Sequence, residues 1–357
     1  MSARPRLRPP FRLRRGPLMY AVVGLILLDC LVYSTSDTWE RYSPDDYAER
    51  VNACRSAPRD LIVVGGSPVS EGIDPSPMRE VSWRGKRLDS VYAMGLPGGT
   101  TSESWHAVKH GSLVPPRLLI YGTTASDLND ARNEHHGPRS LMDWSDWWSW
   151  ASSREDSAEW VTRHFLLSRL GGTWQLFRHR DGIKLWAAHQ AHESLGLAFP
   201  DALARAEKNL EYTRAMREGN GYAPNPDFVN ARYDQRKAAG LVQTSFHFLE
   251  KYRLGDHLSY LQRMLDWAEA NGTDVVRVDM PVAEELESEM YAEEFVQYRA
   301  ALRKLSEERG VRILWANREA LGIDDRHFSD LIHLNGEGAA RLSAWIAEEL
   351  RRMPEGR

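Results

Sequence analysis

Two short segments near opposite ends of the chain carry residues that could perform acyl-transfer chemistry together. The first reads Val63-Val64-Gly65-Gly66-Ser67-Pro68, an apolar run that stops at two glycines and a serine. Glycines at this point allow a sharp turn and leave the Ser67 hydroxyl at the end of a strand, with nearby backbone N–H groups free to face an anion. By itself this segment is more typical of a serine that caps a helix.

The second segment supplies partners for that serine. It reads Phe328-Ser-Asp330-Leu-Ile-His333-Leu-Asn335-Gly336 and directly precedes a predicted amphipathic helix. An Asp and a His three residues apart in a loop can bring their side chains together. Asp330 would then hold one tautomer of the imidazole and leave Nε2 of His333 to take a proton from Ser67. The alternative is that Asp330 and His333 only cap the following helix.

The elements that must position these residues alternate along the chain. Short β-rich runs are expected at 61–64, 88–92, 118–121, 275–278 and 311–315, and helical patterns at 101–111, 256–271, 284–309 and 336–352. This alternation predicts an α/β fold, a three-layer α/β/α arrangement around a mostly parallel five-stranded sheet. Ligands of such sheets bind at the carboxyl ends of the strands, which is where Ser67 is expected.

The order Ser, Asp, His, with the serine after the first strand and the Asp and His in the last loop, resembles the SGNH (GDSL-type) hydrolase superfamily. The resemblance covers about 60–145 and 245–352. It implies that Ser67 is the nucleophile, although the usual Gly-Asp-Ser reads Gly65-Gly66-Ser67 here. It also implies that the N–H groups of Ser67 and Gly95 form an oxyanion hole, since the second family block resembles residues 92–100. An Asn often found two residues before that glycine is Ala93 here.

The third family block, commonly Gly-x-Asn-Asp, falls at residues 122–130 and departs from the pattern. Thr124 stands where the family has its Asn, so the resemblance makes it the expected third oxyanion donor, with Ser126 and Asn129 as alternatives. The last block matches, with Asp330 and His333 as the acid and the base.

The N-terminus indicates a membrane location. Six arginines and no acid fall in residues 1–15, and an apolar run follows from Leu18 to Tyr33. We expect a basic cytoplasmic arm at 1–16, an uncleaved transmembrane signal anchor at 17–33, and the remaining residues outside the cytoplasm. Sixteen helical residues reach about 24 Å, short of the ~30 Å hydrocarbon layer, so a cleaved signal peptide stays open, as does a buried N-terminal helix.

Composition excludes several classes of protein. The chain has 46 basic and 50 acidic residues, and its acidic excess lies beyond the arginine-rich arm, which argues against a nucleic-acid surface. The two cysteines, Cys30 in the apolar run and Cys54, predict neither a disulfide scaffold nor a cysteine zinc site. The spacing of five histidines does not fit metal ligation, so we expect no metal and no cofactor; these are His135, His136, His179, His189 and His192.

Residues 34–59 are expected to form a polar linker, and 60–352 a hydrolase-like domain with a largely helical insertion at about 131–243. Seven of the thirteen tryptophans fall between Trp144 and Trp186. Helical spacing of Trp144, Trp147 and Trp148 favours a helix that packs on a core. The functional alternatives are a lid, a carbohydrate-stacking platform or a surface at the membrane interface.

The anchor, the altered first and third blocks and the insertion are similar to the membrane-attached SGNH proteins of cell-envelope acylation. These include the alginate O-acetylation proteins and the D-alanyl transfer protein of lipoteichoic acid synthesis. The resemblance implies an extracytoplasmic esterase or acyltransferase that acts on an O-acyl group, expected to be acetyl, of a carbohydrate. It also implies a membrane-bound O-acyltransferase as partner. The alternatives are a catalytically weak module that binds a glycan or a membrane partner, and an unrelated α/β protein.

Overall fold

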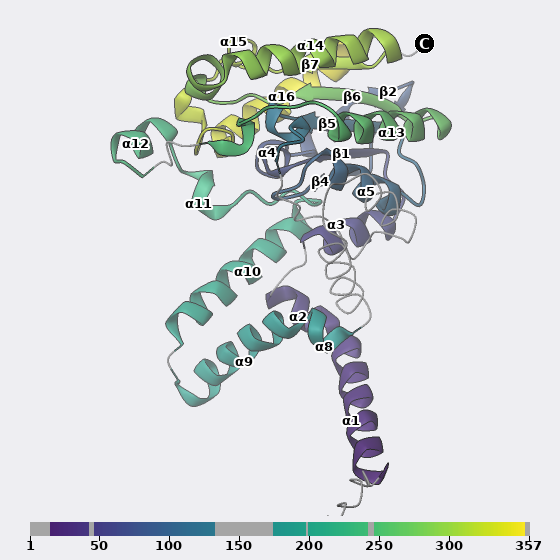
Figure 1. Cartoon of the computed structure of the whole chain (residues 1–357), viewed down its shortest axis with the longest axis vertical. Coiled ribbons are helices and arrows are strands. Elements are labelled where there is room, and N and C mark those ends of the chain that lie inside the picture. The colour runs from purple at the N-terminus through teal and green to yellow at the C-terminus, as the bar shows by residue number, and fades with distance from the viewer. Residues whose placement is uncertain (1–14, 43–45, 133–173, 198, 242–245, 354–357) are drawn as a thin grey trace, which may run out of the picture.

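A five-stranded parallel sheet forms the centre of the molecule (Figure 1). The computed structural model describes residues 15–42, 46–132, 174–197, 199–241 and 246–353. The strand order is β4-β1-β5-β6-β7, and the strands are β1 (Leu61–Gly65), β4 (Val91–Gly95), β5 (Leu118–Thr123), β6 (Asp274–Asp279) and β7 (Arg312–Trp315). The predicted parallel α/β sheet is thus confirmed.

The second predicted strand is displaced by three residues. It was expected at 88–92, whereas β4 begins at Val91. The residues before it belong to a short antiparallel hairpin of β2 (Ser82–Trp83) and β3 (Lys86–Arg87), and the N–H of Leu88 donates to Val81. Hydrogen bonding in this hairpin therefore keeps the apolar Leu88 out of the sheet.

Both faces of the sheet are covered by helices. Side chains alternate along each strand, so Ile62 and Val64 pack toward one helical layer, while Leu61 and Val63 pack toward the other. The first layer consists of α3 (Asp46–Arg55), α5 (Thr101–Gly111) and α13 (Asp256–Ala270). The second consists of α4 (Ser67–Gly72), α14 (Ala292–Arg309) and α16 (Gly336–Arg352). This is the expected three-layer arrangement.

The helix predicted at 284–309 is two elements. A π-helical segment at Glu285–Met290 is followed by α14, and Tyr291 between them has the non-helical dihedral angles φ −139° and ψ 40°. The Tyr291 hydroxyl donates to the carbonyl of Phe246 at 2.5 Å, so a contact distant in sequence accompanies this break. The remaining short elements near the sheet are η1 (Ser76–Glu80), η2 (Ala125–Leu128), η3 (His247–Leu249), α15 (Arg318–Leu321) and η5 (Asp325–His327).

The prediction of a polar linker at 34–59 is wrong. These residues form α2 (Ser36–Tyr42) and α3, and α3 places Val51 and Cys54 in the core beneath the sheet. Arg50 directly precedes Val51 and is fully buried; its guanidinium donates to the Gly221 carbonyl and to the Tyr212 hydroxyl. The polar sequence of α3 can pack into the core because Gly221 and Tyr212, both distant in sequence, accept hydrogen bonds from the buried Arg50 guanidinium. Cys54 is a free thiol, and burial raises its pKa to about 12.

The described part of the insertion is helical, as predicted. It contains α8 (Gln175–Arg178), α9 (Arg180–Leu195), α10 (Pro200–Glu218), α11 (Pro226–Val229) and α12 (Tyr233–Ala238). The pair α9 and α10 packs on α2 through a small cluster that includes Leu185, Ala206 and Tyr42. Trp186 meets Trp39 edge to face, with ring centroids 5.1 Å apart. Trp144, Trp147 and Trp148 lie outside the described residues.

The N-terminal helix α1 (Arg15–Ser34) extends away from the α/β domain, beside α8 (Figure 1). Within the described ranges, no helix taken singly is both long and apolar enough to cross a membrane. The pair Met19–Ser34 and Ser36–Tyr42 passes the same test jointly, across a bend of 70°.

Three glycines at the carboxyl ends of adjacent strands allow α4 to lie directly on the sheet. A Cβ on Gly95 would stand 2.5 Å from the backbone N and Cα of Ser70, and one on Gly122 would stand 2.5 Å from Cγ2 of Val69. A Cβ on Gly65 would collide with the same Val69 side chain and with the Gly122 carbonyl. No other residue type fits beneath α4 at these three positions.

Replacement of Gly95 by Ala should destabilise the protein, because the added methyl group must displace the backbone of α4. Overpacking of this kind costs about 1–3 kcal/mol, which would appear as a lower urea midpoint. Gly111→Ala is the matched control, since its new Cβ would find ordinary contacts of 3.4–3.7 Å. An equal loss of stability in both variants would contradict the role assigned to the close approach.

Candidate active site

Ser67 is the first residue of α4 and follows β1 through Gly65 and Gly66. Gly66 is the N-cap of α4, and its carbonyl accepts from the N–H groups of Val69 and Ser70 at 3.1 Å. The capping alternative is therefore wrong for Ser67, because a residue without a side chain occupies the cap. The hydroxyl of Ser67 lies at the carboxyl edge of the sheet, half-buried, as the sequence predicted.

The structure brings Ser67, His333 and Asp330 together. Nε2 of His333 lies 2.9 Å from Oγ of Ser67, and Nδ1 lies 2.8 Å from Oδ2 of Asp330. The second carboxylate oxygen, Oδ1, accepts from the N–H groups of Ile332 and His333 at 2.9 and 2.8 Å. Both oxygens of Asp330 are thus held, and the imidazole is oriented with one nitrogen toward the serine.

Electrostatics favour an ionised Asp330 and a basic His333. Burial by itself raises the pKa of Asp330, but the hydrogen bond and charge of His333 and the two backbone donors outweigh burial and lower the pKa. Burial lowers the pKa of His333, and the hydrogen bond and charge of Asp330, with smaller contributions from Glu71 and Asp127, raise it above its ordinary value. A raised pKa makes His333 a stronger proton acceptor at neutral pH.

The loop that carries Asp330 and His333 closes on itself. The N–H and the hydroxyl of Ser329 both donate to the His333 carbonyl, at 2.9 and 3.1 Å. The N-cap of α16 is Asn335, whose side chain accepts from the N–H of Gly338. Asp330 and His333 consequently do not cap the helix, and the capping alternative is wrong for them as well.

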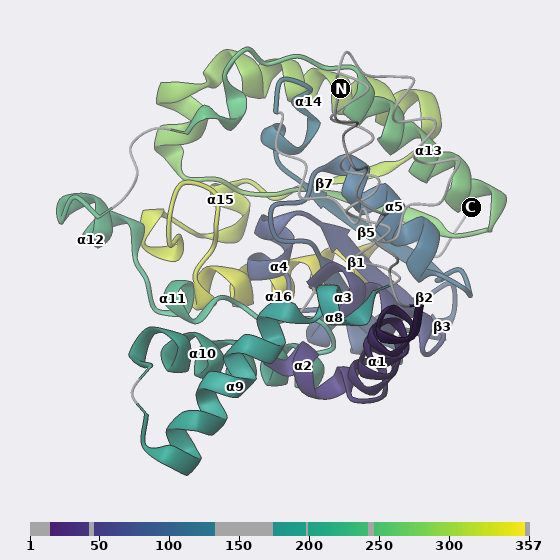
Figure 2. The same cartoon turned by 60° about the horizontal axis from the view of Figure 1, so that its bottom comes forward.

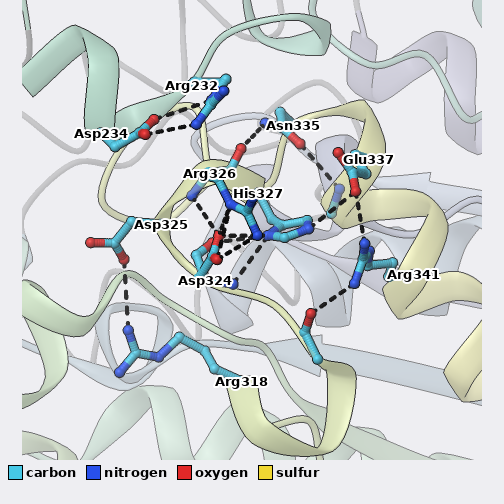
Figure 3. Close-up of polar contacts among 12 residues, drawn as sticks. Arg232, Asp234, Arg318, Asp324, Asp325, Arg326, His327, Asn335, Glu337 and Arg341 are labelled. Carbon is cyan, nitrogen blue, oxygen red and sulfur yellow. Dashed lines mark hydrogen bonds and ion pairs between the residues drawn. The ribbon is translucent and has the colours of Figure 1, made fainter.

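A charged cluster fixes both ends of this loop (Figure 3). His327, at the end of η5, is almost fully buried; Nδ1 lies 3.0 Å from Oδ1 of Asp324, and Nε2 lies 3.2 Å from Oε1 of Glu337 on α16. Arg341 donates to the same Glu337 oxygen at 2.8 Å. His327 thus ties η5 to the first turn of α16. Sequence reasoning missed this residue, although it stands only six positions before His333.

A second residue missed from the sequence, Glu71, is a carboxylate buried beside the three. It follows Ser67 by four residues, one helical turn, so that spacing could have signalled its position. Burial raises the pKa of Glu71. The N–H of Asn225, which donates to Oε2, and the charges of His333 and Arg50 lower this pKa, but burial outweighs them. Glu71 therefore connects α4 to the segment after α10.

That segment, residues 222–236, will be called the strap, because it crosses from α4 to the histidine loop. The Phe228 ring stacks on the His333 ring, with centroids 5.2 Å apart and planes inclined by 28°. Further along, the N–H of Tyr233 donates to the Phe328 carbonyl at 2.7 Å, and the Ala231 carbonyl accepts from the side chain of Asn335. The insertion thus contributes one wall of the site.

Gly66 stands where the resemblance expects an aspartate, and the structure gives the reason. A Cβ at this position would lie 2.8 Å from the Gly99 carbonyl and 3.2 Å from Oδ1 of Asp127. A carboxylate there would both collide with the backbone and face another carboxylate. Gly95 lies in register with Gly65 at the end of β4, next to the start of α4, which keeps its N–H a candidate oxyanion donor beside that of Ser67.

The third donor expected from the sequence is engaged elsewhere. Both the N–H and the hydroxyl of Thr124 donate to Oδ2 of Asp127, at 2.8 and 3.2 Å, and cap η2. The hydroxyl of Ser126 lies 2.8 Å from that of Thr124. The Asn129 amide donates to Phe248 and its oxygen accepts from Arg253. As placed, none of Thr124, Ser126 and Asn129 is available to an oxyanion, which corrects that expectation.

Within the described ranges, no group of three His, Cys, Asp or Glu side chains could hold a metal ion. His179 is buried at the start of α9, and His189 lies 3.3 Å from the hydroxyl of Tyr42. His135 and His136 are outside the described residues.

Comparison with known proteins shows little. No family model and no curated protein matches the chain. Among solved structures, the lipase/acylhydrolase from Enterococcus faecalis is similar to it at 11% identity and a TM-score of 0.38, over 83% of this chain and 98% of that one. At that level of similarity, only the site geometry bears on function.

Glu71→Gln should lower the pKa of His333. The substitution removes a negative charge that stabilises the imidazolium, so His333 should lose its proton at a lower pH. The measurement is an NMR titration of the His333 ring. Glu307→Gln is the control, since Glu307 is an exposed carboxylate of α14 and should leave the titration of His333 unchanged. An unaltered His333 titration in Glu71→Gln would contradict this assignment.

Proposed function

We propose that this protein is an SGNH-type serine esterase or acyltransferase that removes or transfers an O-acyl group, with acetyl as the expected acyl group, on a cell-envelope carbohydrate. The observation that carries the proposal is the continuous hydrogen-bonded chain from Oγ of Ser67 through His333 to Asp330. Such a chain is what nucleophilic catalysis by a serine requires.

In the first half-reaction, Oγ of Ser67 attacks the carbonyl carbon of the ester while Nε2 of His333 takes the hydroxyl proton. Asp330 stabilises the resulting imidazolium through Nδ1. The tetrahedral oxyanion accepts hydrogen bonds from the N–H groups of Ser67 and Gly95; loss of one such donor costs roughly 3–4 kcal/mol in serine hydrolases. The carbon–oxygen bond to the leaving group then breaks, and the alcohol leaves with the proton from His333.

In the second half-reaction, His333 removes a proton from water or from a sugar hydroxyl, whose oxygen attacks the acyl-serine. The bond from the acyl carbon to Oγ of Ser67 then breaks, and His333 returns the proton to Oγ. Water gives an esterase and a sugar gives a transferase. Both routes use the same side chains, so the acceptor alone distinguishes them. No step needs a metal or a cofactor.

The proposal places the catalytic domain outside the cytoplasm, anchored by α1. Supporting this location, most apolar side chains of α1 are exposed, as in a helix surrounded by lipid: Met19, Tyr20, Val22, Val23, Leu25, Ile26, Leu27, Leu28, Leu31 and Tyr33. The cluster of arginines before it would stay on the cytoplasmic side. A membrane-bound O-acyltransferase is the proposed acyl donor.

A second candidate is a catalytically weak module that binds a glycan or a membrane partner. The observation that favours it is the engagement of Thr124, Ser126 and Asn129, which leaves two proposed oxyanion donors instead of three. An enzyme with fewer donors would stabilise the tetrahedral intermediate less.

The full chain in detergent should hydrolyse p-nitrophenyl acetate, and Ser67→Ala or His333→Ala should lower the rate by roughly 10³-fold or more, because each removes a member of the reacting chain. Asp330→Asn should also reduce the rate, since it disfavours the required tautomer. Because only neutral His333 accepts the proton, the rate should fall as the pH drops through its raised pKa.

Glu307→Gln, at an exposed position of α14, serves as the surface control in this assay and should retain activity. Hydrolysis that persists at the same rate in Ser67→Ala and His333→Ala would rule out the serine mechanism. No hydrolysis, together with no acylated Ser67 in the mass spectrum of the treated protein, would favour the binding module. An acyl-serine that a sugar, but not water, discharges would assign the transferase.

A further inference from the structure

The turn between α9 and α10 is an exposed apolar tip. Gly196 ends α9 in a left-handed conformation. Leu195, Leu197 and Phe199 are 71%, 47% and 46% exposed. Exposure of three large apolar side chains within five residues costs free energy in water. It indicates a surface that a membrane or another molecule covers.

The end of the hairpin opposite the tip is attached to α1 through α8. Asp29, the acid within the apolar part of α1, accepts from the N–H of Leu176 at 2.8 Å, so the first turn of α8 satisfies its carboxylate. Only His179 separates α8 from α9, and α9 and α10 both pack on α2. The hairpin is therefore held at the end of α1 where the chain leaves the apolar segment.

The hairpin and α1 leave the α/β domain on the same side. In Figure 1 both lie below the domain, where α1 runs downward and α9 and α10 slant down and away from α1, so that the joined ends of α9 and α10 lie level with α1. In Figure 2, α1 is seen nearly end-on, whereas α9 and α10 lie across the view. Aromatic side chains lie at the level where they meet: Trp174 and Tyr33 are exposed, and Trp39 packs on Trp186. Tryptophan and tyrosine are enriched at the boundary between lipid and water.

We propose that the α9–α10 tip inserts into the interface of the same bilayer that α1 enters, as a second, monotopic membrane contact. This inference rests on the proposed anchor. The occupant is a lipid surface, because the tip lies on the same side of the α/β domain as α1, a helix whose apolar side chains are largely exposed. Two attachments would fix the orientation of the domain on the membrane. They would also place the strap, which follows α10, and with it His333, at a set distance from the lipid.

The test uses the full chain in phosphatidylcholine and phosphatidylglycerol vesicles, with and without nitroxide-labelled acyl chains. Single cysteines carry an environment-sensitive fluorophore. Native Cys30 reports α1; Leu197→Cys, Glu211→Cys and Glu307→Cys, each in a Cys30→Ser background, report the tip, the middle of α10 and the far side of the α/β domain. Cys54 stays unlabelled because it is buried, with a thiol pKa raised to about 12.

We expect nitroxide lipids to quench the probes at Cys30 and Leu197 to a comparable extent, with emission shifted to the blue, and to leave those at Glu211 and Glu307 unchanged. Quenching at Cys30 with none at Leu197 would overturn the second contact while preserving the anchor. No quenching at Cys30 would overturn the anchor and the inference that rests on it. Neither result would touch the serine chemistry, which the esterase assay measures separately.

Discussion

The close seating of α4 on three strand ends is the constraint on which the site depends. Gly95 and Gly65 end the adjacent strands β4 and β1, and Gly122 is the last residue but one of β5; the missing Cβ atoms let Val69 and Ser70 rest on the sheet. Seated this way, α4 presents Ser67 at the carboxyl edge and directs Ser70 to Arg50. If α4 stood farther out, the serine would lose its fixed distance to a histidine that comes from the other end of the chain.

The histidine loop reaches that serine because α16 covers the same face of the sheet as α4. A Cβ on Gly72 would meet Leu334, so the end of α4 and the residue after His333 are in contact range. The hydrogen bond between His327 and Glu337 ties the two ends of the loop together, and the Phe228 ring stacks on the His333 ring. Rigid support on both sides suits a base that must stay within hydrogen-bonding distance of its nucleophile.

Arg50 joins parts of the chain that the sequence separates widely. Its guanidinium contacts Ser70 on α4, the Ala93 carbonyl on β4, Tyr212 on α10 and the Gly221 carbonyl next to the strap. The helical hairpin of α9 and α10 is thereby linked to the helix that carries Ser67. One buried guanidinium can do this because it offers five donors in a fixed planar arrangement.

The sequence alone was enough to predict the α/β class, the helices at 101–111, 256–271 and 336–352 that cover the sheet, and the candidates Ser67, Asp330 and His333. Strand periodicity, glycines and a three-residue spacing are local signals. The sequence did not determine β4's start, the burial of α3 or the break at Tyr291, each of which accompanies contacts with distant residues. Three features became visible only in the folded chain. Asp127 accepts the hydrogen bonds of Thr124, Glu71 is close enough to His333 to raise its pKa, and the Phe228 ring stacks on the His333 ring. Hydrogen-bond partners and ring contacts depend on which segments meet in space, and a linear pattern carries no record of that.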